Sequence, residues 1–316
     1  MATLQVRLFG RFSLARDGEA LSTLGPHKVQ EVLAYLLLFR GRPHARETLA
    51  GVLWGDTTTA QSKKHLRQAL WQLQGALRAG TPSSRRAVLL VSPDWVQVNP
   101  AAYLWIDVVQ LEEADVAFRG ARTEDLDAAA AQMMERAVDL YGGELLEGWY
   151  ADWCTYDRER LRDVYLRMLE QLASYCETHD DVAKGVAFGT RVLRHDRARE
   201  NAHQQLMRLF YRSGDRAAAL RQYGRCRDAL RDELQVDPSA STLALYEQIR
   251  EGRAEEPAAG APLLAPPAGA RARLPEILGH LKQLGRVLAD LQEQIRENTL
   301  MVEGALKPVR GPGRSR

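Results

Sequence analysis

A cluster of cationic and hydrogen-bonding side chains lies between residues 60 and 78. Read as a helix, this stretch presents one polar face that carries Ser62, Lys63, Lys64, Arg67, Gln68, Trp71 and Gln72. No Asp or Glu occurs from Gln61 to Arg78. Lys and Arg can bind phosphates, whereas Arg and Gln can also hydrogen-bond to guanine and adenine edges. The pattern predicts a helix that contacts double-stranded DNA, and a solvated amphipathic helix is the alternative interpretation.

The hydrophobic spacing around this stretch predicts the elements that would position it. In chain order they are a small antiparallel sheet at 3–23, helices at 26–39, 46–54 and 60–78, and a hairpin with strands at 87–91 and 95–98. This is the order of an OmpR-type winged helix, in which one helix enters the major groove. Asp17 and Gly18 are typical of a tight turn in the first sheet. Arg85 and Arg86, at the predicted wing, complete the DNA-contacting set.

The charge of the chain is unevenly distributed. Residues 1–110 hold 13 Lys or Arg and 7 Asp or Glu, whereas residues 111–256 hold 21 and 29. The last segment, 257–316, holds 9 and 5. A basic first region next to an acidic second region favours a polyanionic partner for the first alone, although chance variation between domains is the alternative.

Residues 111–251 have an almost wholly helical pattern with a repeat at an offset of 34 residues. Leu172 matches Leu206, and Asp181 matches Asp215. Thirty-four residues is the tetratricopeptide period, in which one helix–turn–helix unit stacks on the next. We therefore predict a mainly α protein: a winged helix-turn-helix domain with a small β-sheet and wing at 1–110, and an α-helical, tetratricopeptide-like domain at 111–251.

Two further segments follow the predicted repeat. Residues 252–273 are rich in Pro, Ala and Gly, which indicates a flexible linker. Residues 274–306 carry a heptad pattern that predicts an oligomerising coiled-coil helix, and therefore a homo-oligomer. Its seam positions are Leu274, Ile277, Leu281, Leu284, Leu288, Leu291, Ile295, Asn298 and Val302. An amphipathic helix that packs on its own domain is the alternative.

The sequence lacks the common patterns of catalytic and metal sites. It contains no HExxH, GxSxG or GxxxxGK[ST] motif, and its three cysteines are widely spaced. We expect neither an enzyme, nor a cofactor, nor a bound metal. The first residues lack the layout of a signal peptide, and no apolar run is long enough to span a membrane. We therefore expect a cytoplasmic, nucleoid-associated protein with no membrane partner.

Several segments together resemble the Streptomyces antibiotic regulatory protein family. In residues 1–110 they are LQVRLFGRFSL, KVQEVLAYLLL, RPHARETLAGVLWGD and KKHLRQALWQLQGAL. In residues 111–251, AVDLYGGELLEG, DWCTYDRERLRDVYLRMLEQLA, SGDRAAALRQYGRCRDALRDELQVDPS and LALYEQI resemble its bacterial transcriptional activator domain. The resemblance covers about 250 residues in family order. It implies a transcription regulator, most often an activator that binds direct promoter repeats and contacts RNA polymerase holoenzyme. The DNA-reading helix maps onto residues 60–78 and the wing onto 85–99.

Two positions depart from the family pattern. Gln74 stands where many relatives have Arg, and Trp71 stands where a small or polar residue is common. They leave open a second function, a protein-interaction scaffold whose winged helix no longer reads DNA. A third is an effector-sensing repressor that binds a ligand in the concave groove of the helical repeat. The operator, the target genes, the sign of regulation and the oligomer number do not follow from the sequence.

Overall fold

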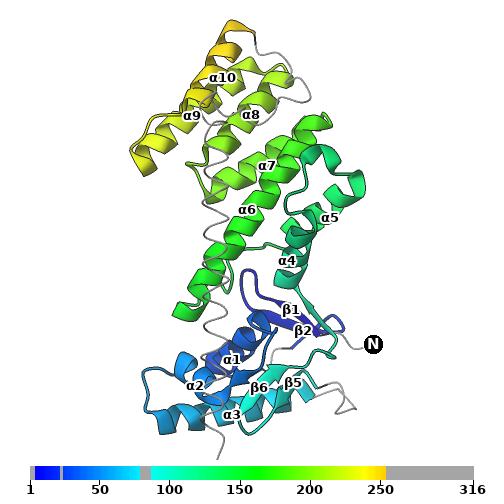
Figure 1. Ribbon diagram of the computed structural model, residues 1–316, viewed down its shortest axis with the longest axis vertical. Coiled ribbons are helices and arrows are strands. Elements are labelled where there is room, and N and C mark those ends of the chain that lie inside the picture. Colours follow the sequence, from blue (N-terminus) through cyan, green and yellow to red (C-terminus); the bar gives the residue numbers. More distant parts are fainter. Residues whose placement is uncertain (1–3, 22–23, 79–86, 254–316) are drawn as a thin grey trace, which may run out of the picture. The chain divides into compact units, whose positions relative to one another are not determined.

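The computed structural model describes residues 4–21, 24–78 and 87–253, which form a mainly helical chain with two small sheets (Figure 1). The described residues belong to one compact unit. The predicted coiled coil at 274–306, the predicted linker beyond Arg253, and both Arg85 and Arg86 lie outside the described residues. For the described part, the predicted order of a winged helix followed by a helical repeat is confirmed.

The N-terminal sheet has the strand order β3-β2-β1-β7. Its strands are β1 (Leu4–Arg7), β2 (Ser13–Arg16), β3 (Glu19–Ala20) and β7 (Leu104–Ile106). Asp17 and Gly18 have φ angles of 52° and 89°, so the predicted tight turn between β2 and β3 is confirmed. Strand β1 pairs antiparallel with β2 and parallel with β7, so a strand nearly 100 residues away forms one edge of the sheet.

Three helices and a second sheet complete the winged helix. The helices are α1 (His27–Leu38), α2 (Arg46–Leu53) and α3 (Thr59–Arg78). The second sheet, of order β4-β6-β5, contains β4 (His44–Ala45), β5 (Leu89–Val91) and β6 (Trp95–Val98). Nine residues of α1 are buried, which makes this helix the centre of the domain. Strands β5 and β6 form the predicted hairpin, although β5 begins two residues later than expected.

Seven further helices follow (Figure 1) within the described residues. They are α4 (Asp107–Phe118), α5 (Ala128–Asp139), α6 (Thr155–Thr178), α7 (Val182–His195), α8 (Glu200–Arg212), α9 (Arg216–Leu234) and α10 (Ala240–Glu251). Short 3-10 segments occur at Thr123–Asp125 (η2) and Asp152–Cys154 (η3). None of the helices in this part of the chain is long and apolar enough to cross a membrane.

The 34-residue repeat is visible in the helix caps. Asp181 accepts a hydrogen bond from the Lys184 backbone N–H at the start of α7, and Asp215 does the same for Ala218 at the start of α9. Both caps have φ −87° and ψ 68°. An Asp at this position satisfies one of the N–H groups that a helix start leaves unpaired. The repeat predicted from residue spacing is therefore a repeat of local structure.

One hydrophobic core runs without a break from β1 into the helical repeat. At the junction, Phe9 forms an isolated antiparallel bridge with Leu145, and the Leu146 N–H donates to the Leu8 carbonyl over 2.8 Å. The Asp107 carboxylate accepts hydrogen bonds from the backbone N–H groups of Leu8 (2.9 Å) and Phe9 (3.0 Å). Burial raises the pKa of Asp107, while these backbone donors act in the opposite direction. The residues that follow β1 are thus joined by hydrogen bonds to the start of α4 and to the segment after α5.

A second contact joins α1 to the start of α6. The Trp153 indole N–H donates to the carboxylate of Glu31 over 3.0 Å. The Glu31 side chain is almost fully buried and also pairs with Lys28 over 2.8 Å. Trp149 packs its ring against Phe12, with 5.5 Å between the ring centroids. A buried carboxylate with two donors is stable at this position, so the contact fixes α1 against the helical region.

Candidate nucleic-acid interface

Helix α3 separates an apolar stripe from a polar face. The buried stripe consists of Leu66, Ala69, Leu70, Leu73 and Leu77. The four leucines follow one another by three or four positions and Ala69 lies beside Leu70, so all five lie on one side of the helix. The opposite side is left to solvent, which is the arrangement that a DNA-contacting helix of a winged helix requires.

The structure places most of the predicted contact residues on this outer side. Lys63, Lys64, Arg67 and Gln68 are exposed, and Gln72 is half-buried. Trp71 is 74% exposed, an unusual exposure for an indole. These side chains share one face of one helix, and the helix contributes no carboxylate to that face. Whether they contact DNA stays a prediction.

Ser62 is a correction to the predicted set. Its residue is only 4% exposed, and its hydroxyl donates to the Thr59 carbonyl over 3.0 Å. Ser62 precedes Leu66 by four positions, and therefore lies on the buried stripe rather than on the outer face. A short hydroxyl at the start of a helix can bond back to the preceding turn, which satisfies it without solvent. Its placement on the outward face was wrong.

The cations of this face differ in whether a carboxylate balances them. Lys63 pairs with Glu47 of α2, with Nζ–Oε1 2.5 Å. The hydrogen bond and charge of Lys63 lower the pKa of Glu47, so Glu47 is ionised at neutral pH. Lys64 and Arg67 have no carboxylate partner among the described residues. This face therefore carries two unbalanced cations, Lys64 and Arg67, and one that is already paired, Lys63.

A hollow of about 430 Å³ lies beside this face. It is lined by Ala45, Arg46, Glu47, Lys63, Leu66, Arg67, Pro93 and Asp94. Arg46 is fixed there, since its guanidinium donates to the Ser92 carbonyl over 3.2 Å and its backbone N–H donates to the Asp94 carbonyl over 2.9 Å. The turn between β5 and β6 therefore lies beside the starts of α2 and α3. Arg85 and Arg86, predicted for the wing, are outside the described residues.

Arg46 and Glu47 were missing from the residues predicted for this site. Both sit in the first turn of α2, a helix whose sequence indicates only a supporting role. The signal in the sequence is the pair of arginines around the helix start, with Arg42 before the helix and Arg46 as its first residue. The Glu47 pairing joins residues 16 apart across a helix–helix turn, and residue spacing gives no measure of that distance.

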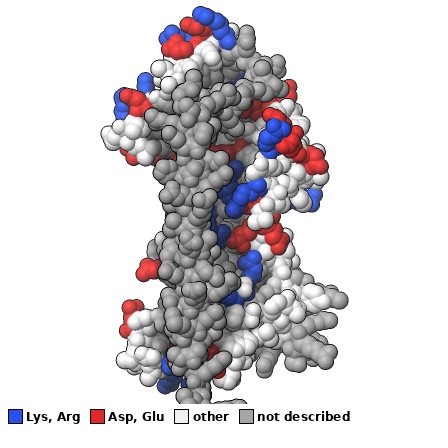
Figure 2. Space-filling model, in the orientation of Figure 1, with Lys and Arg blue, Asp and Glu red and all other residues white. Residues whose placement is uncertain are grey.

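The acidic residues of the helical region lie among basic ones on the face shown in Figure 2. Figure 2 shows blue and red side chains interspersed over the described residues visible on this face. Many of them are paired between helices, for example Arg199 with Glu170 and Arg208 with Glu177, each with 2.7 Å between nitrogen and oxygen. These arginines therefore bridge neighbouring helices.

The architecture is that of a winged helix joined to a helical repeat, and comparisons with known proteins agree. The model of the bacterial transcriptional activator domain matches residues 106–250. Regulatory protein AfsR of Streptomyces coelicolor is 28% identical over 99% of this chain, and AfsR of Streptomyces griseus 25% over 99%. The chain spans about a third of the length of both proteins, 32% and 31%.

A shorter relative and a solved structure extend the comparison. Transcriptional regulatory protein MoaR1 of Mycobacterium tuberculosis is 26% identical, over 78% of this chain and 79% of its own length. The structure of Mycobacterium tuberculosis EmbR in complex with low affinity phosphopeptide has a TM-score of 0.67 at 20% identity. That similarity covers 90% of this chain and 72% of the EmbR chain, and it supports the fold. Residues 106–250 thus match the bacterial transcriptional activator domain, and the similarity to AfsR and MoaR1 supports the resemblance to the Streptomyces antibiotic regulatory protein family.

Proposed function

We propose that this chain is a sequence-specific DNA-binding transcription regulator that activates promoters by contacting RNA polymerase. The observation that carries the proposal is the outer face of α3, which is exposed, cationic and free of Asp and Glu. A helix of this kind can lie in the major groove while its apolar stripe stays in the core. The relatives that are named as regulatory proteins also support a role in transcription regulation.

The side chains of α3 divide by chemistry. Lys64 has a flexible stem and a point charge, which suits a phosphate without regard to sequence. Arg67 and Gln68 present paired donors or a donor and an acceptor, which suit guanine and adenine edges. Trp71 offers a large apolar surface that suits a thymine methyl or a sugar. Gln72 is half-buried and completes the polar residues of α3 that we propose to contact DNA.

The remaining parts of the proposal concern assembly and location. The heptad residues at 274–306 would join two or more chains, so that several DNA-binding heads act on repeated sites. The protein would work on the nucleoid in the cytoplasm, without a catalytic step or a cofactor. Light scattering of the full chain and of the Leu281→Asp/Leu288→Asp variant tests the assembly: a lower mass for the variant is expected, and an unchanged mass contradicts it.

DNA binding is tested by selecting bound fragments from a random pool and titrating the selected duplex with the full chain. If about four phosphates are neutralised, affinity falls roughly a hundredfold between 50 and 200 mM salt. Lys64→Ala should weaken all sequences alike, and Gln68→Ala should change the selected sequence. Lys184→Ala, in α7 and exposed, serves as the control with the same loss of charge.

Two outcomes would contradict the proposal. Undetectable binding, or binding that does not depend on salt, would favour an interaction scaffold whose winged helix does not read DNA. In that function, the exposed indole of Trp71 would bind a protein partner. Trp71→Ala would then weaken binding of that partner, and added DNA would not change the partner's affinity.

A further inference from the structure

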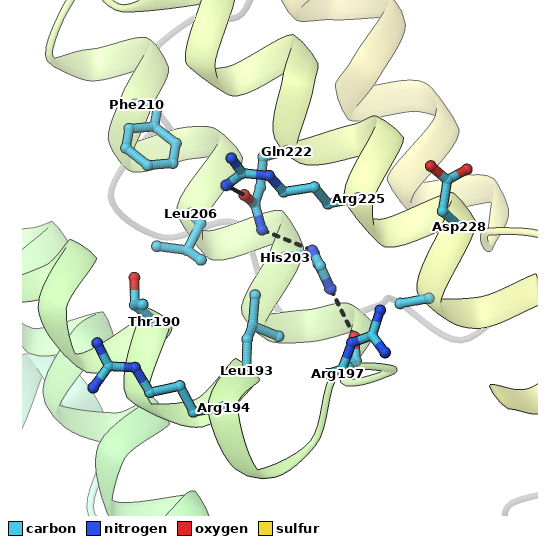
Figure 3. Close-up of a pocket in the computed structure, with 11 residues that line it drawn as sticks. Thr190, Leu193, Arg194, Arg197, His203, Leu206, Phe210, Gln222, Arg225 and Asp228 are labelled. Carbon is cyan, nitrogen blue, oxygen red and sulfur yellow. Dashed lines mark hydrogen bonds between the residues drawn. The ribbon is translucent and has the colours of Figure 1, made fainter. Parts of the chain in front are cut away.

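A cavity of about 440 Å³ lies in the helical repeat, remote in sequence from α3. Its lining comes from α7, α8, α9 and the turn between α7 and α8 (Figure 3). Leu193, Leu206 and Phe210 provide an apolar part. The volume falls within the range of about 300–1,000 Å³ typical of small-molecule pockets.

The polar part of the lining is strongly cationic. Arg194, Arg197 and Arg225 contribute three positive charges against the single carboxylate of Asp228. Asp228 is itself paired with Arg227, with Nη2–Oδ1 2.9 Å. Arg194 and Arg225 have no carboxylate partner among the described residues, and Arg197 has only Glu233 at 3.9 Å. The arginines of this cavity therefore differ from those that bridge helices elsewhere in the repeat.

A chain of hydrogen bonds through the buried His203 and Gln222 reaches one cation of the cavity, Arg225 (Figure 3). His203 contacts the Arg197 carbonyl through Nε2 over 2.9 Å, and a carbonyl only accepts, so Nε2 is the donor. Gln222 then donates through its amide nitrogen to Nδ1 of His203 over 2.8 Å. The Gln222 carbonyl accepts from Arg225 over 3.3 Å. His203 and Gln222 are only 3% and 2% exposed. The network links the Arg197 turn to the Arg225 guanidinium through side chains that are fixed before any ligand arrives.

The apolar part is fixed as well. A Cβ atom at Gly189 would lie 2.9 Å from Leu206 Cδ2, so only glycine allows α7 and α8 to approach this closely. Leu206 is 2% exposed and cannot move to fill the cavity without breaking this packing. A lining that combines fixed apolar groups with a few placed cations suits a ligand with the same two parts.

We infer that this cavity binds a small organic anion: an apolar body against Leu193, Leu206 and Phe210, with a carboxylate, sulfonate or phosphate held by Arg194 and Arg225. Guanidinium groups bind such oxyanions through paired N–H donors. The site goes beyond the proposed function and does not require that α3 bind DNA.

The test uses 8-anilinonaphthalene-1-sulfonate, an aromatic sulfonate whose fluorescence reports binding, with the full chain. Saturable binding is expected, weakened at least about tenfold in Arg194→Gln/Arg225→Gln, since two charge-assisted contacts are lost. The matched control is Arg221→Gln: this exposed arginine lies on α9, one turn before Arg225 and outside the cavity lining, and its loss should change the affinity less than twofold. Cooperative thermal unfolding of each variant checks that the fold is kept.

Three results would overturn the inference. They are equal binding by the wild type and the double variant, equal loss in the Arg221→Gln control, or displacement of the probe by a hexaglutamate peptide at lower concentration than by 1-naphthoate. The last result would assign the cavity to an acidic protein segment. Affinity for the selected DNA, measured on the same variants, is a separate readout, so failure of the cavity and failure of DNA binding are distinguishable.

Discussion

Cationic side chains serve two different purposes in the two regions of this molecule. In the helical repeat, arginines reach across to carboxylates on neighbouring helices, as Arg199 does to Glu170 and Arg167 to Asp115. On α3, Lys64 and Arg67 point away from the core and have no such carboxylate among the described residues. The same residue types form ion pairs between helices in one region and remain unpaired, and so able to bind an anionic ligand, in the other.

This difference teaches how to recognise a binding surface in a protein with many charges. The number of arginines is greater in the repeat, but most of their charge is already balanced. Exposed ion pairs add little stability, whereas a buried carboxylate that loses its partner is costly. A cation that remains unbalanced is therefore a better indicator of an anionic ligand than a high count of cations. Arg194 and Arg225 are among the arginines of the repeat without a carboxylate partner in the described residues, and both line one cavity.

The largest expected effect is on stability, at a buried carboxylate of the repeat. Asp115 of α4 is 3% exposed and pairs with Arg119 and with Arg167, the latter over 2.6 Å. Although burial opposes ionisation, these arginines lower the net pKa of Asp115, so its stabilising effect is present at neutral pH and disappears as the pH falls through this lowered pKa. Asp115→Asn should reduce the free energy of unfolding by about 2 kcal/mol, less than for a fully buried pair because both arginines reach solvent. Denaturant titration measures this.

The control for that prediction is the same substitution in an exposed pair. Asp139 bonds to Arg191 over 2.9 Å, but its side chain is 67% exposed. Asp139→Asn should change the unfolding free energy by less than about 0.5 kcal/mol. Equal losses at Asp115 and Asp139 would contradict the view that the buried pairs of the repeat are structural.

The next effect concerns the unbalanced cations of α3. Arg67→Ala should weaken binding to the selected DNA by about 1–3 kcal/mol and relax the sequence preference, while leaving the unfolding free energy unchanged within about 0.5 kcal/mol. Fluorescence anisotropy and denaturant titration measure the two quantities. If the variant loses stability but keeps its DNA affinity, Arg67 has a structural role like the paired arginines of the repeat, and the proposed difference between the two regions is wrong.

A smaller effect is expected from pH, through the buried imidazole of the repeat. Burial lowers the pKa of His203, more than the facing carboxylate of Glu200 raises it, and Arg225 lowers it further. The unfolded chain then binds a proton that the folded chain does not. Stability should therefore fall by up to about 1 kcal/mol for this group as the pH decreases from 7 to 5.5.

Thermal unfolding at both pH values, in the wild type and His203→Gln, checks this prediction. The variant should lose less stability on acidification than the wild type. His195, whose pKa is also lowered by burial and by Arg162, still contributes in the variant, so part of the pH dependence should remain. Identical pH dependence in both proteins would show that His203 is not the group responsible.

The smallest effect is expected at Lys63 of α3, whose charge Glu47 balances. Glu47→Gln removes the carboxylate that pairs with Lys63 and leaves this lysine for phosphate. Affinity for DNA should increase about two- to fivefold at low salt, and the gain should shrink at high salt because exposed charges are screened. Thr48→Ser, on the same helix and without a change of charge, is the control. Unchanged affinity in Glu47→Gln would show that Lys63 does not approach the phosphates.

Local patterns predicted much of the fold. The spacing of apolar residues predicted α1 at 26–39, and the structure has His27–Leu38. The 34-residue offset predicted two equivalent units, and Asp181 and Asp215 cap them with the same geometry. Each of these features depends on residues close in the chain, whose positions are set by helix or turn geometry.

Features that depend on distant residues were not predicted. The parallel pairing of β1 with β7 joins Val6 to Ile106, and periodicity within either segment gives no information on this partner. Ser62 is different, because its four-residue spacing to Leu66 places it on the buried stripe, although a hydroxyl is typical of a polar face. Arg46 joins the interface only because the turn before β6 folds against α2. The fold was therefore more predictable than the neighbours of the candidate site.

The bridge between Phe9 and Leu145 has a consequence for promoter geometry. Because the core continues through this junction, we expect the orientation of the winged helix on DNA to set the direction of the repeat. If α3 is in the groove, the repeat projects from one side of the duplex, and its direction follows the helical phase of the binding site. Insertion of about 5 bp, half a turn of DNA, between that site and the promoter would direct the repeat to the opposite side, and a whole turn of about 10 bp would restore it.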